Sequence, residues 1–447
     1  GELSVTGGAG GVTERLGLVV AGGDLGSAIT TDSTAGSIHL VMNALRFDGQ
    51  GVIGFVGLGS ELSAAGANRV TVVNAPSGSA VMVNGISPTA TVRNASGRID
   101  QATYTSVADG FGIIRLPDDI YVTDINLATA TSNVRLSAGV HTLTDNRTIN
   151  SLILEDGAIL QGSDVALTVN NGNNLSSLVL GNNARIDVDV LTLGSRAYFR
   201  VVTGSTATIG STITGAVFAL AKDGAGKLIL TGDNQFSGQF FINSGILNIQ
   251  RSTALGAHGT GAANSSSTHV RSGATLELEE TSFGSINVLT EGLTLEGIGF
   301  NDMGAIRNVT GTNSWAGTIY QAGPVTNLSQ QLGGFPVLNS GQVQYRVDTG
   351  SWLNLSGAIT NNVELIKTGG GTLETSGVLF NTYDASTRVL EGTYLLNKEP
   401  GVNAVINFVQ VGSDKAGAPS ATLKLGGSDQ MRDDRGIRVH SSGLFDL

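Results

Sequence analysis

The segment Leu220–Gly256 reads LAKDGAGKLILTGDNQFSGQFFINSGILNIQRSTALG, and it returns in altered form further along the chain. Its start, LAKDGAGKL, matches LIKTGGGTL (Leu365–Leu373) at an offset of 145 residues. Its later part SGILNI (Ser244–Ile249) matches EGTYLL (Glu391–Leu396) at an offset of 147 residues. Self-similarity at a nearly fixed period is the sequence signature of repeat architectures. The segment therefore predicts a repetitive fold instead of a single globular core.

Three further pairs of segments keep the same order and offset. They are FRVVTGS (Phe199–Ser205) with YRVDTGS (Tyr345–Ser351), IGSTIT (Ile209–Thr214) with LSGAIT (Leu355–Thr360), and GATLEL (Gly273–Leu278) with SATLKL (Ser420–Leu425). Five matches in one order are hard to obtain by chance. They predict two copies of a unit of about 146 residues, the second of them degenerate and truncated.

Short strand-like segments rich in β-branched residues fill the sequence, and glycine or asparagine separates them. No stretch of twelve or more residues has helical apolar spacing. The strand spacing alone is typical of a sandwich, a barrel or a parallel solenoid. The repeats favour the solenoid, because a coil of roughly twenty residues cannot bury its apolar side unless it stacks on another coil.

Composition excludes several classes of protein. The chain has 447 residues, of which 64 are glycine and none is cysteine, so disulfides and thiolate metal sites are excluded. Its net charge of −11 disfavours nucleic acid as a partner. No apolar run approaches the roughly 20 residues that span a bilayer, so we expect no membrane insertion.

We predict four parts along this all-β chain. Residues 1–110 form an irregular β-rich N-terminal module, which could also be continuous with the solenoid. Residues 111–198 form solenoid coils, residues 199–344 the first repeat unit, and residues 345–447 the second.

The segment at residues 220–256 resembles the autotransporter-associated β-strand repeat. The pattern of that family is a lysine, a glycine pair, a short strand, a Gly-x-Asn turn, an aromatic residue, a glycine, and a Gly-Leu strand. The matching positions are Lys222, Gly224, Gly226, Leu228, Gly232, Asn234, Phe236, Gly238, Gly245 and Leu247.

The second copy keeps only part of this pattern, namely Lys367, Gly369, Gly371 and Leu373. The segment SGVLFNTYDAS (Ser376–Ser386) replaces the Gly-x-Asn turn and the aromatic position. The resemblance implies a right-handed parallel β-solenoid in a large secreted protein of the bacterial cell surface, and hence an extracellular location.

A polysaccharide-active solenoid enzyme would need carboxylates that converge from adjacent coils. The candidate groups are Asp118/Asp119, Asp187/Asp189, Glu277/Glu279/Glu280 and Asp433/Asp434. Alternation with apolar residues places Asp187 and Asp189, and likewise Glu277 and Glu279, on solvent faces. The histidines form no HxxH or HExxH pair; they are His39, His141, His258, His269 and His440. We therefore predict no catalytic, cofactor or metal site.

The aromatic residues offer two interpretations. We expect Phe199, Phe236, Phe240, Phe241 and Tyr345 to stack inside the coils. The two tryptophans, Trp315 and Trp352, pack in a core or corner, or they line a face that binds carbohydrate.

These patterns favour a structural role. Stacked coils would make a stiff rod or fibre, and open strand edges could add a further copy of the chain end to end. The alternative is an adhesin that binds glycans or other surface ligands. A polysaccharide-active enzyme is the third possibility.

Overall fold

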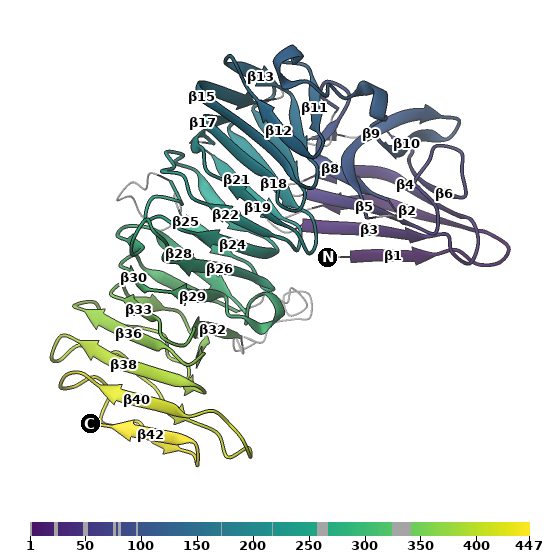
Figure 1. Ribbon diagram of the computed structural model, residues 1–447. Helices are drawn as coiled ribbons and strands as arrows, with labels where there is room; N and C mark the ends of the chain where they lie inside the picture. The colour runs from purple at the N-terminus through teal and green to yellow at the C-terminus, as the bar shows by residue number, and fades with distance from the viewer. Residues whose placement is uncertain are drawn as a thin grey trace. The chain divides into compact units, whose positions relative to one another are not determined.

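The computed structural model describes residues 2–21, 26–47, 52–74, 77–78, 82–94, 97–170, 172–216, 218–256, 267–323 and 341–447. The chain divides into two compact units, Gly1–Gly226 (unit 1) and Lys227–Leu447 (unit 2) (Figure 1). The described residues form strands and three short 3-10 helices, η1 (Asp118–Ile120), η2 (Ile125–Leu127) and η3 (Phe300–Asp302). The predicted all-β class is confirmed. None of the helices in these ranges is long and apolar enough to cross a membrane.

Unit 1 begins with a ten-stranded sheet ordered β1-β3-β5-β8-β9-β10-β6-β4-β2, with β7 paired to β4. Its strands are β1 (Glu2–Thr6), β2 (Val12–Ala21), β3 (Gly26–Asp32), β4 (Ile38–Phe47), β5 (Val52–Leu58), β6 (Asn68–Val72), β7 (Ser77–Gly78), β8 (Ser87–Arg93), β9 (Ile99–Val107) and β10 (Gly110–Arg115).

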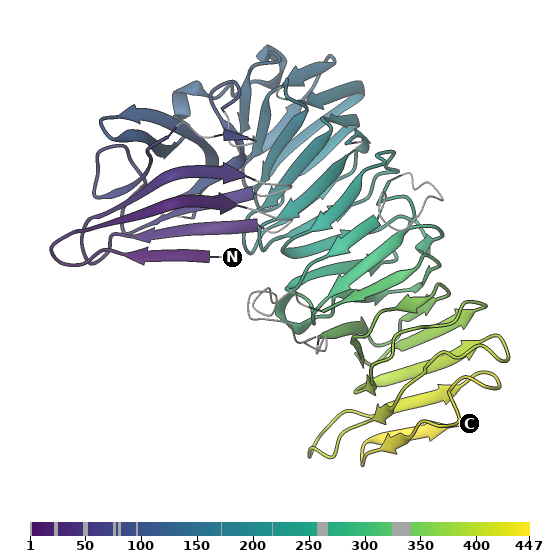
Figure 2. The same ribbon diagram turned by 180° about the vertical axis from the view of Figure 1, so that it is seen from behind.

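This N-terminal sheet contains both parallel and antiparallel strand pairs. Strand β1 pairs in parallel with β3, and β2 pairs in parallel with β4, each at a step of 26 residues. The inner side chains form one apolar cluster that includes Leu40, Phe55 and Val72. The strands drawn in purple lie side by side (Figure 2). The sheet as a whole is mixed, because β8, β9, β10 and β6 pair antiparallel and the register of β8 and β9 shifts between Ser87 and Thr91. The N-terminal module therefore stays a prediction.

The rest of unit 1 consists of coils with two parallel sheets. One sheet contains β11 (Asn133–Leu136), β14 (Ser151–Leu154), β16 (Leu175–Leu180), β18 (Arg196–Val201) and β21 (Ala219–Asp223). The other contains β12 (Gly139–Thr142), β13 (Arg147–Ile149), β15 (Ala158–Val169), β17 (Arg185–Leu193), β19 (Thr206–Ile209) and β20 (Thr212–Gly215).

Strands β14 and β16 are buried on both faces, which their sequences explain. They read SLIL and LSSLVL and lack the charged residues that a solvent-facing side would need. Their outward residues Ile153 and Val179 pack with Ile86, Leu116 and Tyr121 from the preceding part of the chain. Ile86 of the N-terminal module, together with Leu116 and Tyr121 from the segment that follows it, thus covers one face of these coils.

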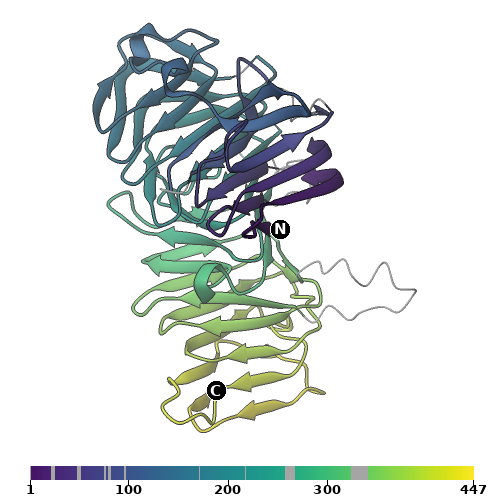
Figure 3. The same ribbon diagram turned by 90° about the vertical axis from the view of Figure 1, so that its right-hand side faces the viewer.

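Unit 2 consists of coils with three parallel sheets (Figure 3). The first sheet contains β23 (Gln239–Ile242), β25 (Ser267–Val270), β28 (Gly292–Glu296), β31 (Ile319–Ala322) and β34 (Ile359–Thr360). The second contains β22 (Lys227–Leu230), β24 (Gly245–Ile249), β26 (Ala274–Glu279), β29 (Ile306–Thr310), β32 (Gln342–Val347), β35 (Glu364–Thr368), β37 (Thr387–Val389), β39 (Val409–Val411) and β41 (Ile437–Val439). The third contains β27 (Asn287–Val288), β30 (Thr312–Trp315), β33 (Trp352–Leu355), β36 (Thr372–Gly377), β38 (Gly392–Lys398), β40 (Ala421–Leu425) and β42 (Gly443–Asp446).

The register within unit 2 repeats from coil to coil. Leu365 of β35 lies opposite Thr387 of β37, and Thr387 lies opposite Val409 of β39, so each step is 22 residues. The inward side chains are aliphatic, as in β22, where Leu228 and Leu230 are buried. These stacked parallel strands are consistent with the predicted parallel β-solenoid.

The two sequence copies occupy different faces of the coils. Strand β23 belongs to the first sheet of unit 2, whereas its counterpart β37 belongs to the second. In the same way β24 lies in the second sheet and its counterpart β38 in the third. A strand that alternates inward and outward residues fits any face of a solenoid. Corresponding strands of the two copies therefore need not lie in the same sheet, and we looked for the features that the copies share in the turns between the strands.

Candidate functional site

Lys222, the first residue of the repeat pattern, points into the coil interior. It lies opposite the buried Phe199 in the neighbouring strand and is itself buried. Its Nζ donates hydrogen bonds to the carbonyl oxygens of Gly224 (2.5 Å) and Gly226 (2.6 Å). Burial lowers the pKa of Lys222 to about 7, although the carboxylate of Asp223 opposes this decrease. The ammonium thus closes the glycine turn that follows its own strand.

Lys367 repeats this arrangement in unit 2. Its Nζ donates to the carbonyl oxygens of Thr368 (2.9 Å), Gly369 (2.6 Å) and Glu391 (2.8 Å). Burial lowers its pKa to about 7, and the Glu391 carboxylate opposes the decrease. An ammonium has three N–H donors, so Lys367 satisfies three backbone acceptors at the point where two successive coils turn.

The glycines of the two turns are required by their backbone. Gly224 and Gly369 both have a φ of +77°, a left-handed conformation that side chains disfavour. A Cβ on Gly224 would lie 2.1 Å from the carbonyl oxygen of Val201, and one on Gly369 would lie 2.3 Å from that of Val347. Each glycine therefore lets the turn lie directly against the preceding coil.

Asn234 and Phe236 form the second conserved turn of the first copy. The Asn234 side chain is buried, and its Nδ2 donates to the carbonyl oxygen of Ala254 at 2.7 Å. Phe236 is buried and contacts Phe240 edge to face, with ring centroids 5.9 Å apart. The asparagine joins one coil to the next, and the aromatic ring fills the interior behind it.

Asn381 and Tyr383 take the places of Asn234 and Phe236 in the second copy. The sequence analysis did not identify this pair. Asn381 Nδ2 donates to the carbonyl oxygen of Ala404 at 2.8 Å, and Tyr383 is fully buried. The prediction that Ser376–Ser386 replaces this turn is therefore wrong. The segment keeps the Asn-x-aromatic spacing but has two more residues between the glycine and the asparagine. The Asn-x-aromatic spacing was the sequence signal that could have identified Asn381 and Tyr383 as the counterparts of Asn234 and Phe236.

A third buried lysine, Lys398, is absent from the predicted set. Its Nζ donates to the carbonyl oxygen of Ser376 at 2.9 Å, one coil away. Burial lowers its pKa to about 8. Its position at the end of β38 shows that lysine can close a turn of these coils outside the repeat pattern as well.

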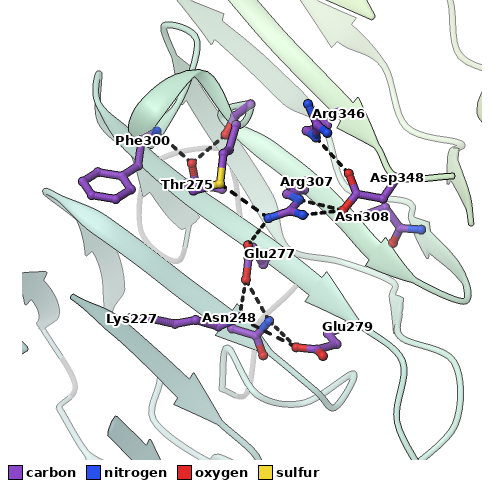
Figure 4. Close-up of polar contacts among 12 residues, drawn as sticks. Lys227, Asn248, Thr275, Glu277, Glu279, Phe300, Arg307, Asn308, Arg346 and Asp348 are labelled. Carbon is purple, nitrogen blue, oxygen red and sulfur yellow. Dashed lines mark hydrogen bonds and ion pairs between the residues drawn. The ribbon is translucent and has the colours of Figure 1, made fainter. Parts of the chain in front are cut away.

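A charged ladder crosses the outer face of the second sheet of unit 2 (Figure 4). Glu277 accepts from Lys227 at 2.7 Å and from Arg307 at 2.9 Å. Arg307 also donates to Asp348 at 2.9 Å, and Arg346 donates to the same carboxylate at 2.8 Å. Burial alone would lower the pKa of Arg307, but Asp348 and Glu277 raise it. Cations and anions thus contact one another across the coils from β22 to β32.

Glu277 corrects the prediction of a solvent-facing carboxylate. Its side chain does lie on the outer face, but the residue is only 1% exposed because its charged neighbours cover it. Glu279 is partly exposed and accepts from Asn248 Nδ2 at 2.8 Å. The ladder brings acids and bases together across coils, yet both oxygens of Glu277 are held by cations. A general acid needs a carboxyl that can keep and donate a proton, so the arrangement is that of an ion-pair network.

One of the comparisons with known proteins finds a family for the repeat of the first copy. Residues 220–249 match the family model of the passenger-associated-transport-repeat. The match supports the resemblance to autotransporter-associated repeats. No curated protein and no solved structure matches the chain.

The passenger-associated-transport-repeat runs here from β21 to β24 and includes both conserved turns of the first copy. Its leucines Leu228 and Leu247, like Leu373 of the second copy, are buried in the coil interior. Gly232 and Gly238 are buried, and Gly245 has a φ of +69°. The residues of the repeat thus serve the packing and joining of coils.

Asp118 joins a buried ion-pair cluster in unit 1. Arg135, which is 7% exposed, contacts Asp100 and donates to Asp118 at 2.6 Å. Its guanidinium lies 3.9 Å from the ring centroid of Tyr121. Burial would raise the pKa of Asp118, but hydrogen bonds from Arg115 and Arg98 hold it below its usual value. This cluster ties β9 to β11, and with them the N-terminal module to the first coil.

The two tryptophans have different surroundings. Trp315 is fully buried, and its indole nitrogen donates to the carbonyl oxygen of Glu291 at 2.9 Å. Trp315 therefore cannot line a ligand face, because β30 directs it inward. Trp352 is 37% exposed on the outer face of β33.

The remaining predicted aromatics are all buried, with one difference in direction. Phe199, Phe240 and Tyr345 lie inside the coils. Phe241 follows Phe240 in the same strand and so points to the opposite side, where it stacks on His269 at 4.8 Å.

Other predicted polar positions lie apart from one another. Asp189 and Asp433 are exposed, and Asp187 pairs with Arg185. Asp119 lies in the 3-10 helix η1, Glu280 directly follows β26, and Asp434 pairs with Arg432 at 2.8 Å. His258 lies outside the described residues. Over the described ranges, no group of three or more histidine or acidic side chains could hold a metal ion.

Proposed function

We propose that this chain is a stretch of right-handed β-solenoid in a secreted bacterial surface protein and that its role is structural. The stacked coils would act as a stiff spacer that holds other parts of a longer protein, or a partner, away from the cell. The passenger-associated-transport-repeat supports this location. The lysine turn carries the proposal, because the same buried ammonium closes a glycine turn in both copies.

Rigidity follows from how the turns are built. Each conserved turn uses side chains to satisfy backbone groups of its own coil or of the next, so a coil cannot swing without breaking buried hydrogen bonds. The ladder of Glu277 and Arg307 adds ion pairs along the outer face. Such contacts run from neighbour to neighbour, which is the property of solenoids that lets stiffness extend with length.

A structural role also accounts better for the carboxylates than catalysis does. Glu277 is held by two cations, and Asp118 is held by three arginines. We further propose that copies of the chain associate with one another, since parallel strands readily accept a further strand at an open edge.

Electron microscopy of the purified chain tests the spacer role. We expect negatively stained particles that are clearly longer than they are wide, and sedimentation that shows larger species as protein concentration rises. Compact, nearly round particles would contradict the spacer proposal. Elongated particles that stay monomeric at all concentrations would contradict only the self-association.

A further inference from the structure

The outer face of the third sheet of unit 2 carries a group of side chains that the structural role does not require. We call this group the Trp352 strip; it consists of Trp352, Asn354, Glu374, Ser376 and Asn397. These residues come from β33, β36 and β38, which are adjacent parallel strands (Figure 1). Their side chains share the outer face, because residues two apart in a strand point to the same side.

The Trp352 indole leans across the sheet. Its nitrogen donates to Glu374 Oε2 at 2.8 Å. The Cα partner of Trp352 on the next strand is Thr372, so Glu374 lies two residues further along that strand. The ring therefore reaches diagonally over the sheet surface, and with 37% of the residue exposed it offers solvent an apolar platform. The hydrogen bond to Glu374 fixes its orientation.

The polar members of the strip are held in place by one another. Glu374 Oε1 accepts from Asn397 Nδ2 at 2.7 Å, and Asn354 Oδ1 accepts from Ser376 at 2.8 Å. In the described part of the chain, Glu374 forms no ion pair within 4.0 Å. Its carboxylate is thus a fixed negative charge without a cation, next to an exposed aromatic face.

Trp352 differs from the residues that lie in register with it on the neighbouring strands. Its neighbours in register are Thr312 before it, and Thr372 and then Thr393 after it. Threonine is a common choice for the exposed side of a strand. The tryptophan fills no coil interior here, and it presents an aromatic face to solvent beside the polar side chains of the strip.

We propose that the Trp352 strip binds a glycan chain that carries no acidic groups. The apolar face of a pyranose ring would stack on the indole, and its hydroxyl or amino groups would donate to Glu374. An amino sugar should bind more tightly than its N-acetylated form, because an ammonium gains from both the carboxylate and the aromatic face. Uronic acid chains should be repelled by Glu374. This site does not depend on the proposed spacer role.

Saturation-transfer NMR with three oligosaccharides tests the site. The probes are oligomers of glucosamine, of N-acetylglucosamine and of galacturonic acid. We expect signals with the first two, tighter binding of glucosamine oligomers, and no binding of galacturonate. Trp352→Ala should weaken binding by more than about tenfold, whereas Trp352→Phe should retain part of it. Glu374→Gln should remove the preference for the free amine and keep binding of the N-acetylated oligomer.

Two features of the chain supply the controls. Tyr320→Ala removes another exposed aromatic, 49% exposed on the first sheet of unit 2, and should leave binding unchanged. The buried Trp315 reports folding by its fluorescence, so a variant that has merely unfolded is recognised. The proposal is overturned if neither of the first two probes binds, if galacturonate binds as well as they do, or if folded Trp352→Ala binds like the unmodified chain.

Discussion

Replacing Arg135 by alanine is expected to lower the free energy of unfolding of unit 1 by about 3–5 kcal/mol. Arg135 is almost fully buried, and so is its partner Asp100, which is 1% exposed. The substitution removes the contacts to Asp100 and Asp118 and the cation over Tyr121. Among the residues that the structure describes, Arg98 is then the remaining ion-pair partner of the buried Asp100 carboxylate.

Hydrogen exchange measured by mass spectrometry checks this prediction, because it reports β9 and β11 separately from unit 2. Replacing both partners, as in Arg135→Leu with Asp100→Leu, should restore much of the loss, since it leaves no charge unpaired. The solvent-exposed pair of Arg432 and Asp434 supplies the control, and Arg432→Ala should not alter exchange in unit 1. If Arg135→Ala leaves β9 and β11 as protected as before, the cluster does not join the module to the coils.

Replacing Lys367 by methionine is expected to destabilise unit 2 by about 2 kcal/mol at pH 9 and by clearly less at pH 6. At pH 9 the side chain of Lys367 is a neutral amine with two N–H donors, so the substitution costs two hydrogen bonds to the carbonyl oxygens that surround it, those of Thr368, Gly369 and Glu391. At pH 6 the buried Lys367 ammonium lowers the free energy of unfolding of the unmodified chain, because burial disfavours the charge. Methionine has no charge, so the difference between the two chains is smaller there.

The direction of this pH dependence follows from the lysine pKa values. In the folded chain the pKa of Lys367 is about 7 and that of Lys398 about 8, whereas an unfolded lysine titrates near 10.4. Between these values the unfolded chain binds more protons, so the free energy of unfolding rises with pH. Buried tyrosines such as Tyr394, with a pKa raised to about 12, reverse the trend above about pH 10.

Urea unfolding followed by tryptophan fluorescence measures this effect, since both tryptophans lie in unit 2. Lys367→Met should flatten the rise in stability between pH 7 and pH 9. The exposed Lys415 offers the matched control, and Lys415→Met should keep the full rise. An equal rise in Lys367→Met and in the unmodified chain would show that this lysine is not buried as described.

The sequence was sufficient to predict stacked coils, through the offset of about 146 residues between its two copies. It placed Lys222 before a glycine pair, but the burial of this lysine and its hydrogen bonds to the turn appear only in the structure. The strands that read SLIL and LSSLVL also contained a usable signal, because a strand without outward polar residues needs cover on both faces. That cover came from residues far away in sequence, such as Leu116, which no local pattern identifies.

The errors have a common physical origin. Alternation assigned Glu277 correctly to the outer face, but its burial depends on Lys227 and Arg307, which lie on other coils. Asn381 was missed because a two-residue insertion before it shifted the alignment, although its hydrogen bond to the next coil is unchanged. A sequence shows which side of a strand a residue takes, whereas the neighbouring coils decide what surrounds it.

Disulfide formation between engineered cysteines tests the stacking of coils most directly, because the chain has no cysteine of its own. Thr372 and Thr393 are Cα partners on adjacent parallel strands, about 4.8 Å apart, within the range that a disulfide can bridge. Thr422 lies one coil further on, at about twice that distance from Thr372. Stacked coils predict rapid oxidation of the 372/393 pair and almost none of the 372/422 pair in the folded chain. Equal oxidation of the two pairs, or failure of the 372/393 pair in a folded chain, would contradict the parallel β-solenoid.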